Sequence, residues 1–153
     1  MVIYIIKCGI IIGTRRKETL QQIKFLLLNN IKIKNRSDEI GNIDLFYFPE
    51  NSRKSLISPE FIDKLKKYDV LILSGGYTAY FFLNSSGFIS IENKESIMPL
   101  VSIGVIHGGI LNNKIVILKG GSIGNNDIYL KIIKTLDADT VNSPHEWIGE
   151  LPA

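Results

Sequence analysis

The sequence is poor in several residue types, and each shortage removes a class of protein. Cys8 is the one cysteine among 153 residues, which excludes an intramolecular disulfide and a metal cluster held by cysteines. The formal net charge is only +3, from 18 Lys and Arg against 15 Asp and Glu. Because these charges are dispersed, they do not predict a nucleic-acid partner. A hydrophobic content of 45% still supplies the core of one domain.

Long uninterrupted hydrophobic runs are also missing. Residues 70–91 and 96–113 carry no charged side chain, but glycine, serine and asparagine interrupt the first run, and Pro99 and three glycines interrupt the second. A membrane span needs about 20 apolar residues in sequence. The apolar N-terminus contains Lys7 and lacks the basic start of a secretory signal. We therefore expect a soluble, cytoplasmic protein without a membrane partner.

Short apolar segments alternate with amphipathic ones along the chain. Strands are expected over residues 2–12, 43–48, 70–73, 99–105 and 115–118. Helical patterns end near residues 29–30, begin at Ser58 and Pro59, and cover residues 77–83 and 128–136. This order predicts a single doubly wound α/β domain, residues 1–136, with a mostly parallel sheet and helices on both faces. Residues 137–153 are expected to form an irregular tail packed on that domain.

Three of the expected strands pass into a helix through glycine, at residues 13–14, 75–78 and 120–124. In a parallel sheet such junctions meet at one edge, where α/β proteins bind ligands. Free backbone N–H groups at a helix start favour phosphate, and glycine lets the ligand approach the backbone closely. A single junction of this kind is usually a plain tight turn. With three in one small domain, a shared phosphate site and plain tight turns are equally favoured. None of the three matches the dinucleotide fingerprint or the P-loop.

Basic residues lie beside two of these junctions. Arg15, Arg16 and Lys17 open the first expected helix, where the dipole disfavours cations, so they are either solvated or compensated by a bound anion. Lys119 ends the last expected strand, from which it either reaches a polyphosphate or leaves the sheet edge into water. His107 is expected to be structural. No His, Asp and Glu share metal-ligand spacing, and no residue is identified as catalytic.

Together the three junctions resemble the C-terminal nucleotide-binding domain of the four-carbon acid sugar kinases. Gly-Thr at residues 13–14 with Thr-x-x-Gln at 19–22 is similar to that domain's first motif, a Gly-Ser followed by Thr-x-x-Gln. Gly-Gly-Tyr-Thr-Ala at residues 75–79 resembles its Gly-Gly-Asp-Thr-(Ala/Ser) motif. Lys-Gly-Gly-Ser-Ile-Gly at residues 119–124 is similar to its Lys-(Ser/Gly)-Gly-x-(Phe/Val)-Gly motif. The ordered set covers roughly residues 2–136.

The resemblance implies ATP as the cofactor, with Mg²⁺ as a companion ion left open. The residues that it implies for the nucleotide are Thr14, Gly75, Gly76, Tyr77, Thr78, Lys119, Gly121 and Gly124. Thr14 would donate its hydroxyl to the nucleotide. The second junction would present a helix N-terminus, and the glycines of the third would let the backbone approach.

Two departures from that family separate the possible functions. Tyr77 stands where the family has an acidic residue, and the substrate motif Asp-Asp-x-Thr-Gly-Ala is absent. One hypothesis is an ATP-binding kinase subunit that is inactive without a separate substrate-binding partner. The alternative is a non-catalytic nucleotide- or anion-binding module, and a purely structural remnant also stays open. The expected partner is an adenine nucleotide, while a separate substrate-binding kinase subunit and a homo-oligomer are left open.

Overall fold

The chain folds into alternating strands and helices in the computed structural model, which describes residues 6–13, 16–35, 41–48, 58–121 and 123–142. The elements in chain order are β1 (Ile6–Ile12), α1 (Lys17–Asn35), β2 (Gly41–Tyr47), α3 (Pro59–Lys64), the 3₁₀ turn η2 (Leu65–Lys67), β3 (Val70–Ser74), α4 (Gly76–Ser86), β4 (Ser90–Met98), β5 (Val101–His107), β6 (Ile115–Lys119) and α5 (Ile128–Asn142). Within these residues, no helix is long and apolar enough to cross a membrane.

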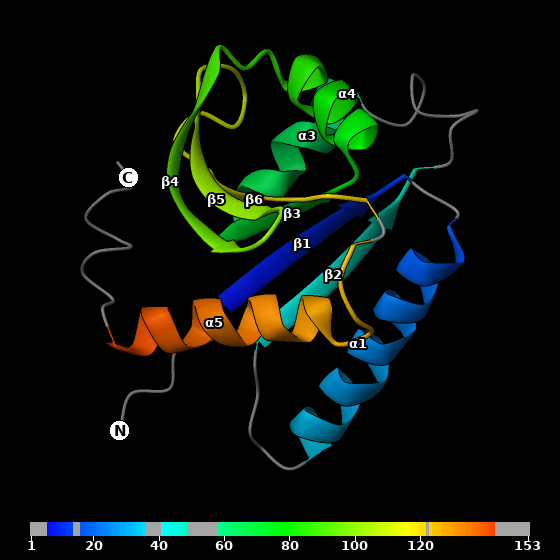
Figure 1. Cartoon of the computed structure of the whole chain (residues 1–153). Coiled ribbons are helices and arrows are strands. Elements are labelled where there is room, and N and C mark those ends of the chain that lie inside the picture. Colours follow the sequence, from blue (N-terminus) through cyan, green and yellow to red (C-terminus); the bar gives the residue numbers. More distant parts are fainter. Residues whose placement is uncertain (1–5, 14–15, 36–40, 49–57, 122, 143–153) are drawn as a thin grey trace.

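All six described strands form one sheet in the order β2-β1-β3-β6-β5-β4 (Figure 1). The first four are parallel to one another, whereas β5 runs antiparallel to β6 and β4 antiparallel to β5. The central strands β3 and β6 are wholly or nearly wholly buried, as apolar strands covered on both faces should be. The mostly parallel α/β sheet expected from the sequence is therefore confirmed.

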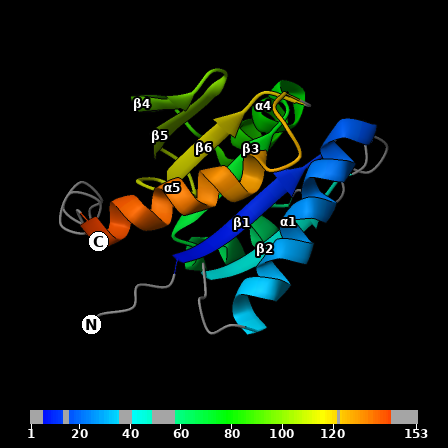
Figure 2. The ribbon, with the colours of Figure 1, turned by 60° about the horizontal axis from the view of Figure 1, so that its bottom comes forward.

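Helices cover both faces of this sheet. Along β3, Val70 and Ile72 join one buried cluster with residues of α1 and α5, while Leu71 and Leu73 join a second cluster with residues of α3 and α4. Figures 1 and 2 show these two pairs of helices on opposite sides of the strands. The alternation of side chains along a strand thus supplies two separate cores, which is the doubly wound arrangement.

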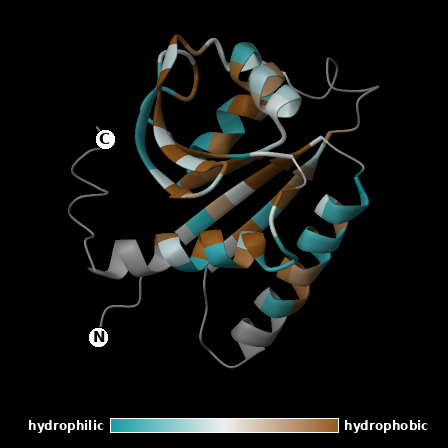
Figure 3. Ribbon diagram, viewed as in Figure 1, coloured by the Kyte–Doolittle hydropathy of each residue, from teal (hydrophilic) through white to brown (hydrophobic). Residues whose placement is uncertain are grey.

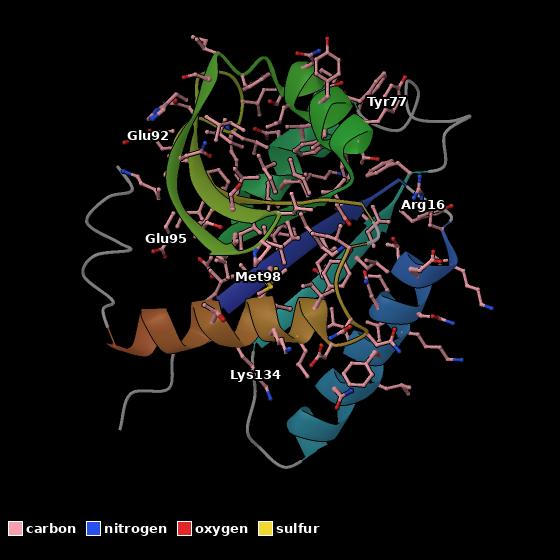
Figure 4. The ribbon with its side chains drawn as sticks, in the orientation of Figure 1. Arg16, Tyr77, Glu92, Glu95, Met98 and Lys134 are labelled. Atoms are coloured by element: carbon pink, nitrogen blue, oxygen red, sulfur yellow. The ribbon has the colours of Figure 1, made fainter. Side chains whose placement is uncertain are left out.

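Strand β4 was not expected from the sequence. It lies at the edge of the sheet, pairs only with β5 among the described residues, and is exposed along most of its length. Figure 3 shows hydrophilic residues along it, and in Figure 4 Glu92 and Glu95 project from it away from the helices. Charged side chains on an edge strand discourage pairing with another chain. They also remove the apolar pattern by which a strand is recognised.

Helix boundaries agree with the sequence at some ends and differ at others. The Ser58 hydroxyl accepts a hydrogen bond from the Phe61 N–H at 3.2 Å, which confirms the N-cap before Pro59. Gly87 ends α4 in the left-handed conformation. Helix α1 continues to Asn35, beyond the expected end. Helix α5 continues to Asn142, so residues 137–142 of the expected tail are helical, and residues 143–153 lie outside the described residues.

Candidate functional site

The three glycine junctions meet at one edge of the sheet. Ile12 of β1 is in register with Ser74 of β3, and Ser74 is in register with Lys119 of β6. The glycines that follow these strand ends therefore lie side by side at the carboxyl edge, as the sequence predicted. Of the predicted ligands, Thr14 lies outside the described residues.

The second junction forms the start of α4. The Gly75 N–H donates to the Lys119 carbonyl oxygen at 2.9 Å, which ties the second junction to the third. Gly75 has φ +95°, a conformation that favours glycine, and no side chain caps the helix there. Because the first N–H groups of a helix have no partner within it, this helix start presents donors at the sheet edge.

Tyr77 and Thr78 occupy different environments in the first turn of α4. The Thr78 side chain is buried, so what it offers to a ligand is its backbone. Tyr77 is 67% exposed, and its ring lies 6.4 Å from that of Phe81. In the view of Figure 4, Tyr77 and Arg16 lie on the same side of the molecule, near the starts of α4 and α1.

Three side chains hold the carbonyl groups of the third junction. The Lys119 ammonium donates to the carbonyl oxygens of Gly120 at 3.2 Å and of Gly121 at 2.5 Å. From α1, the Thr19 hydroxyl donates to the Gly121 oxygen at 3.4 Å, and the Gln22 amide donates to two further carbonyl oxygens at 3.0 Å each. These two acceptors belong to Ile123 and Gly124. Thr19 and Gln22 are the matched residues of the first motif, so that motif fastens the third junction.

These hydrogen bonds also fix the direction of the N–H groups in the same peptide units. In a planar trans peptide the carbonyl oxygen and the N–H of the next residue point in opposite directions. The N–H groups of Gly121, Gly124 and Asn125 therefore point away from Lys119 and Gln22. The part of the chain that the structure describes provides no acceptor for these three groups. The Ile123 N–H, in contrast, donates to the Gly120 carbonyl oxygen at 3.4 Å. Of the three unpaired groups, those of Gly124 and Asn125 are successive, and successive backbone N–H groups of this kind favour an anion.

Lys119 is buried rather than solvated. Its side chain is 2% exposed, and its ammonium lies 4.9 Å from the centre of the Tyr129 ring. The Tyr129 hydroxyl lies 2.6 Å from the Ser74 hydroxyl at the end of β3. Burial lowers the pKa of Lys119 to about 8. Of the two alternatives for Lys119, the exit from the sheet edge into water is therefore wrong, whereas contact with a polyphosphate stays a prediction.

A pocket of about 480 Å³ opens beside the second and third junctions. Part of its lining comes from residues of those junctions, namely Gly75, Gly76, Lys119 and Gly120. The rest is formed by strand and helix residues and by the turn between β4 and β5, namely Leu73, Ala79, Ser96, Leu100, Val101, Ser102 and Leu118. Sequence reasoning did not place the β4–β5 hairpin here, because its position depends on pairing with β6.

A second, more polar pocket of about 500 Å³ lies on the other side of the third junction. It is lined by Glu18, Gln21, Gln22 and Phe25 of α1 and by residues 124–127 before α5. His107, in contrast, lies far from both junctions. Its ring pairs with Glu92 at 2.8 Å, at the end of β5 that adjoins the start of β6. Cys8 is buried in β1, and burial raises the pKa of its thiol to about 12. Neither belongs to the candidate site.

Comparison with solved structures shows that this fold is similar to that of DUF1537 proteins. A domain of unknown function (DUF1537) from Bordetella bronchiseptica, a domain-swapped dimer with bound citrate, matches with a TM-score of 0.66 and 12% identity. The match covers 88% of this chain and 42% of that one. A DUF1537 protein from Haemophilus influenzae matches with a TM-score of 0.52 and 16% identity, over 86% of this chain and 40% of its own.

These identities are too low to show more than the shared fold. The fold that the sequence resemblance implied is thereby confirmed, while nucleotide binding and equivalence to a C-terminal domain stay predictions. The chain spans about two fifths of the length of the matched proteins. No family model and no curated protein matches the sequence.

Proposed function

We propose that this chain binds ATP and forms the nucleotide-binding part of a sugar-acid kinase, which a separate substrate-binding chain completes. The observation that carries the proposal is the meeting of the glycine junctions at one sheet edge, with the third junction fixed so that the N–H groups of Gly121 and Gly124 face outward. Backbone N–H groups and a helix start stabilise phosphate, and glycine leaves room for it.

In this proposal the phosphates lie along two of the junctions. Residues 75–78 offer the start of α4, and Gly121, Gly124 and Asn125 offer their outward N–H groups. The Lys119 ammonium adds a positive charge beneath them. Thr14 would donate its hydroxyl from the first junction. Glu18 and Asp127 line the second pocket with Gly124 and Asn125, so these carboxylates would help the phosphates to hold Mg²⁺, which would neutralise charge there.

The need for a partner chain follows from size and from the chemistry of transfer. The DUF1537 proteins are more than twice as long as the part matched here. Phosphoryl transfer depends on positioning and charge stabilisation around both reactants. The citrate bound by the Bordetella protein is a small carboxylate, the class of ligand that a sugar-acid kinase accepts. A second chain would supply that substrate site.

Tyr77 favours one second candidate, a nucleotide-binding module without catalysis. The residue is exposed in the first turn of α4 and stands where the kinase motif has an acidic residue. The junctions that hold phosphate do not depend on that carboxylate. Binding would then persist while transfer is lost, and the chain would sense or sequester a nucleotide rather than use it.

Titration calorimetry with ATP and ADP, with and without Mg²⁺, tests the binding. The informative variant is Gly121→Val, because a Cβ built at Gly121 meets no atom within 4 Å. The fold should therefore accept valine, whereas the branched side chain would block the approach of a phosphate. We expect an unchanged unfolding temperature and loss of binding, with Gly121→Ala intermediate. Absence of heat with the wild-type chain and either nucleotide at millimolar concentration would refute the proposal.

A further inference from the structure

The turn between β4 and β5 holds a leucine in a costly conformation. Leu100 has φ +61°, and among the described residues only Asn113 shares a positive φ without being glycine. Asparagine adopts this conformation with little strain, but a branched side chain does so at a cost. Leu100 is also 71% exposed. Strained residues tend to cluster where a ligand is held.

Leu100 is fastened to the third glycine junction. Its carbonyl oxygen accepts a hydrogen bond from the Gly120 N–H at 3.1 Å. A Cβ built at Gly120 would lie 3.7 Å from the Cβ of Leu100. The leucine is therefore not a loose loop residue, because its backbone and its side chain are both placed against the predicted phosphate site.

The pocket that Leu100 borders has a lining of two chemical kinds. Gly75, Gly76, Lys119 and Gly120 belong to the glycine and lysine edge already described. Ala79, Val101 and Leu118 add apolar walls. Its volume of about 480 Å³ lies within the range of roughly 300–1,000 Å³ found for small-molecule sites. Ser102 also lines it, and its hydroxyl has no hydrogen-bond partner within the described ranges.

These observations fit a ligand that is anionic at one end and flat and apolar at the other. A sugar acid or inorganic phosphate would leave the apolar walls unused. We propose that this pocket is the subsite for the heteroaromatic base of the nucleotide, with Leu100 packed on the face of the ring and Ser102 bonded to its edge. The inference rests on the proposed function, because it places the base of the ligand whose phosphates the junctions hold.

Leu100→Gly separates contact with the base from stability of the fold. Glycine adopts φ +61° without strain, and little buried surface is lost, so the unfolding temperature should not fall. Loss of the apolar contact should raise the Kd for ATP by about three- to tenfold. The Kd for tripolyphosphate, which carries no base, should stay within about twofold. Calorimetry with both ligands measures the difference.

Asn113→Gly is the matched control. Asn113 has φ +72° and precedes β6 at the opposite edge of the sheet, so this variant should bind both ligands as the wild type does. Leu100→Asn is a second variant that keeps the left-handed turn and removes the apolar side chain, and it should repeat the result. An ATP affinity unchanged in both Leu100 variants would overturn the subsite, and so would an equal loss for ATP and tripolyphosphate. Failure of the wild-type chain to bind ATP would instead refute the proposed function, and the subsite with it.

Discussion

At the scale of single residues, Lys119 links the sheet to the candidate site. It is the last residue of β6, and its carbonyl oxygen accepts a hydrogen bond from the Gly75 N–H. Its ammonium donates hydrogen bonds to two carbonyl oxygens of the third junction. A buried ammonium is costly unless polar groups surround it. Here the carbonyl oxygens and the Tyr129 ring provide that surrounding. The residue is thus placed to favour an anion just outside the loop.

Lys119 should make ATP binding depend on pH. Its pKa is lowered to about 8 by burial. A phosphate nearby favours the charged ammonium, so binding raises this pKa, and affinity is highest below about pH 8 and falls above it. We expect the Kd for ATP to increase between about pH 7.5 and about pH 9.5, measured by calorimetry.

Two variants control for other titrating groups. Lys119→Met should bind ATP more weakly and without this pH dependence. Lys134 is exposed on α5 and points away from the sheet in Figure 4, so Lys134→Met should keep the wild-type slope. A pH dependence that persists unchanged in Lys119→Met would contradict the assignment.

At the scale of elements, α1 and the third junction behave as one unit. Thr19 and Gln22 reach carbonyl groups that lie about a hundred residues further along the chain. Both side chains are buried. The position of the third junction therefore depends on α1, a helix about a hundred residues earlier in the sequence, and not on its glycines alone.

Gln22→Leu should damage both stability and phosphate binding. The change leaves the carbonyls of Ile123 and Gly124 without the donor that they share, which should cost about 1–3 kcal/mol in the free energy of unfolding. The junction would then lose its fixed direction, and the Kd for tripolyphosphate should rise. Urea denaturation and calorimetry measure the two effects. Gln21→Leu alters the exposed neighbour and should change neither, so equal behaviour of the two variants would contradict the prediction.

The elements also show why sequence reasoning succeeded in one place and failed in another. Residues 70–73 and 115–118 are apolar runs because parallel strands buried on both faces need no alternation, and both strands were predicted. The segment Ser90–Met98 is polar and exposed, and pairing with β5 makes it a strand. The meeting of the glycine junctions at one edge was predicted because it follows from the parallel order of these strands. The position of Leu100 beside the pocket was not predicted, because it depends on the pairing of Val101 with Lys119 between two strands.

At the scale of the whole molecule, the candidate site has only part of an enclosure. The sheet, α4 and the β4–β5 turn form its walls. The matched proteins contain more than half of their length beyond the aligned region. A kinase must bring the attacking hydroxyl to about 3–3.5 Å from phosphorus and keep water away. The described walls enclose only one side of such a site.

The purified chain should therefore lack kinase activity towards threonate and erythronate. A coupled assay for ADP release measures this. Calorimetric ATP binding by the same sample is the control, since it shows that the nucleotide site is intact while transfer is absent. Turnover in the ordinary kinase range of about 1–100 s⁻¹ would show that the chain is self-sufficient.

Positions in the antiparallel β4–β5 hairpin, which forms part of the pocket wall, differ in how well they tolerate substitution. Val101 is buried beside the turn, and changes there would disturb the core. Leu100, which lines the pocket, is exposed, so changes there cost the fold little. Selection, or an engineer, can therefore reshape one wall of the site while the strands that support it stay constant. Homologous chains that diverge in ligand preference should differ first in this hairpin.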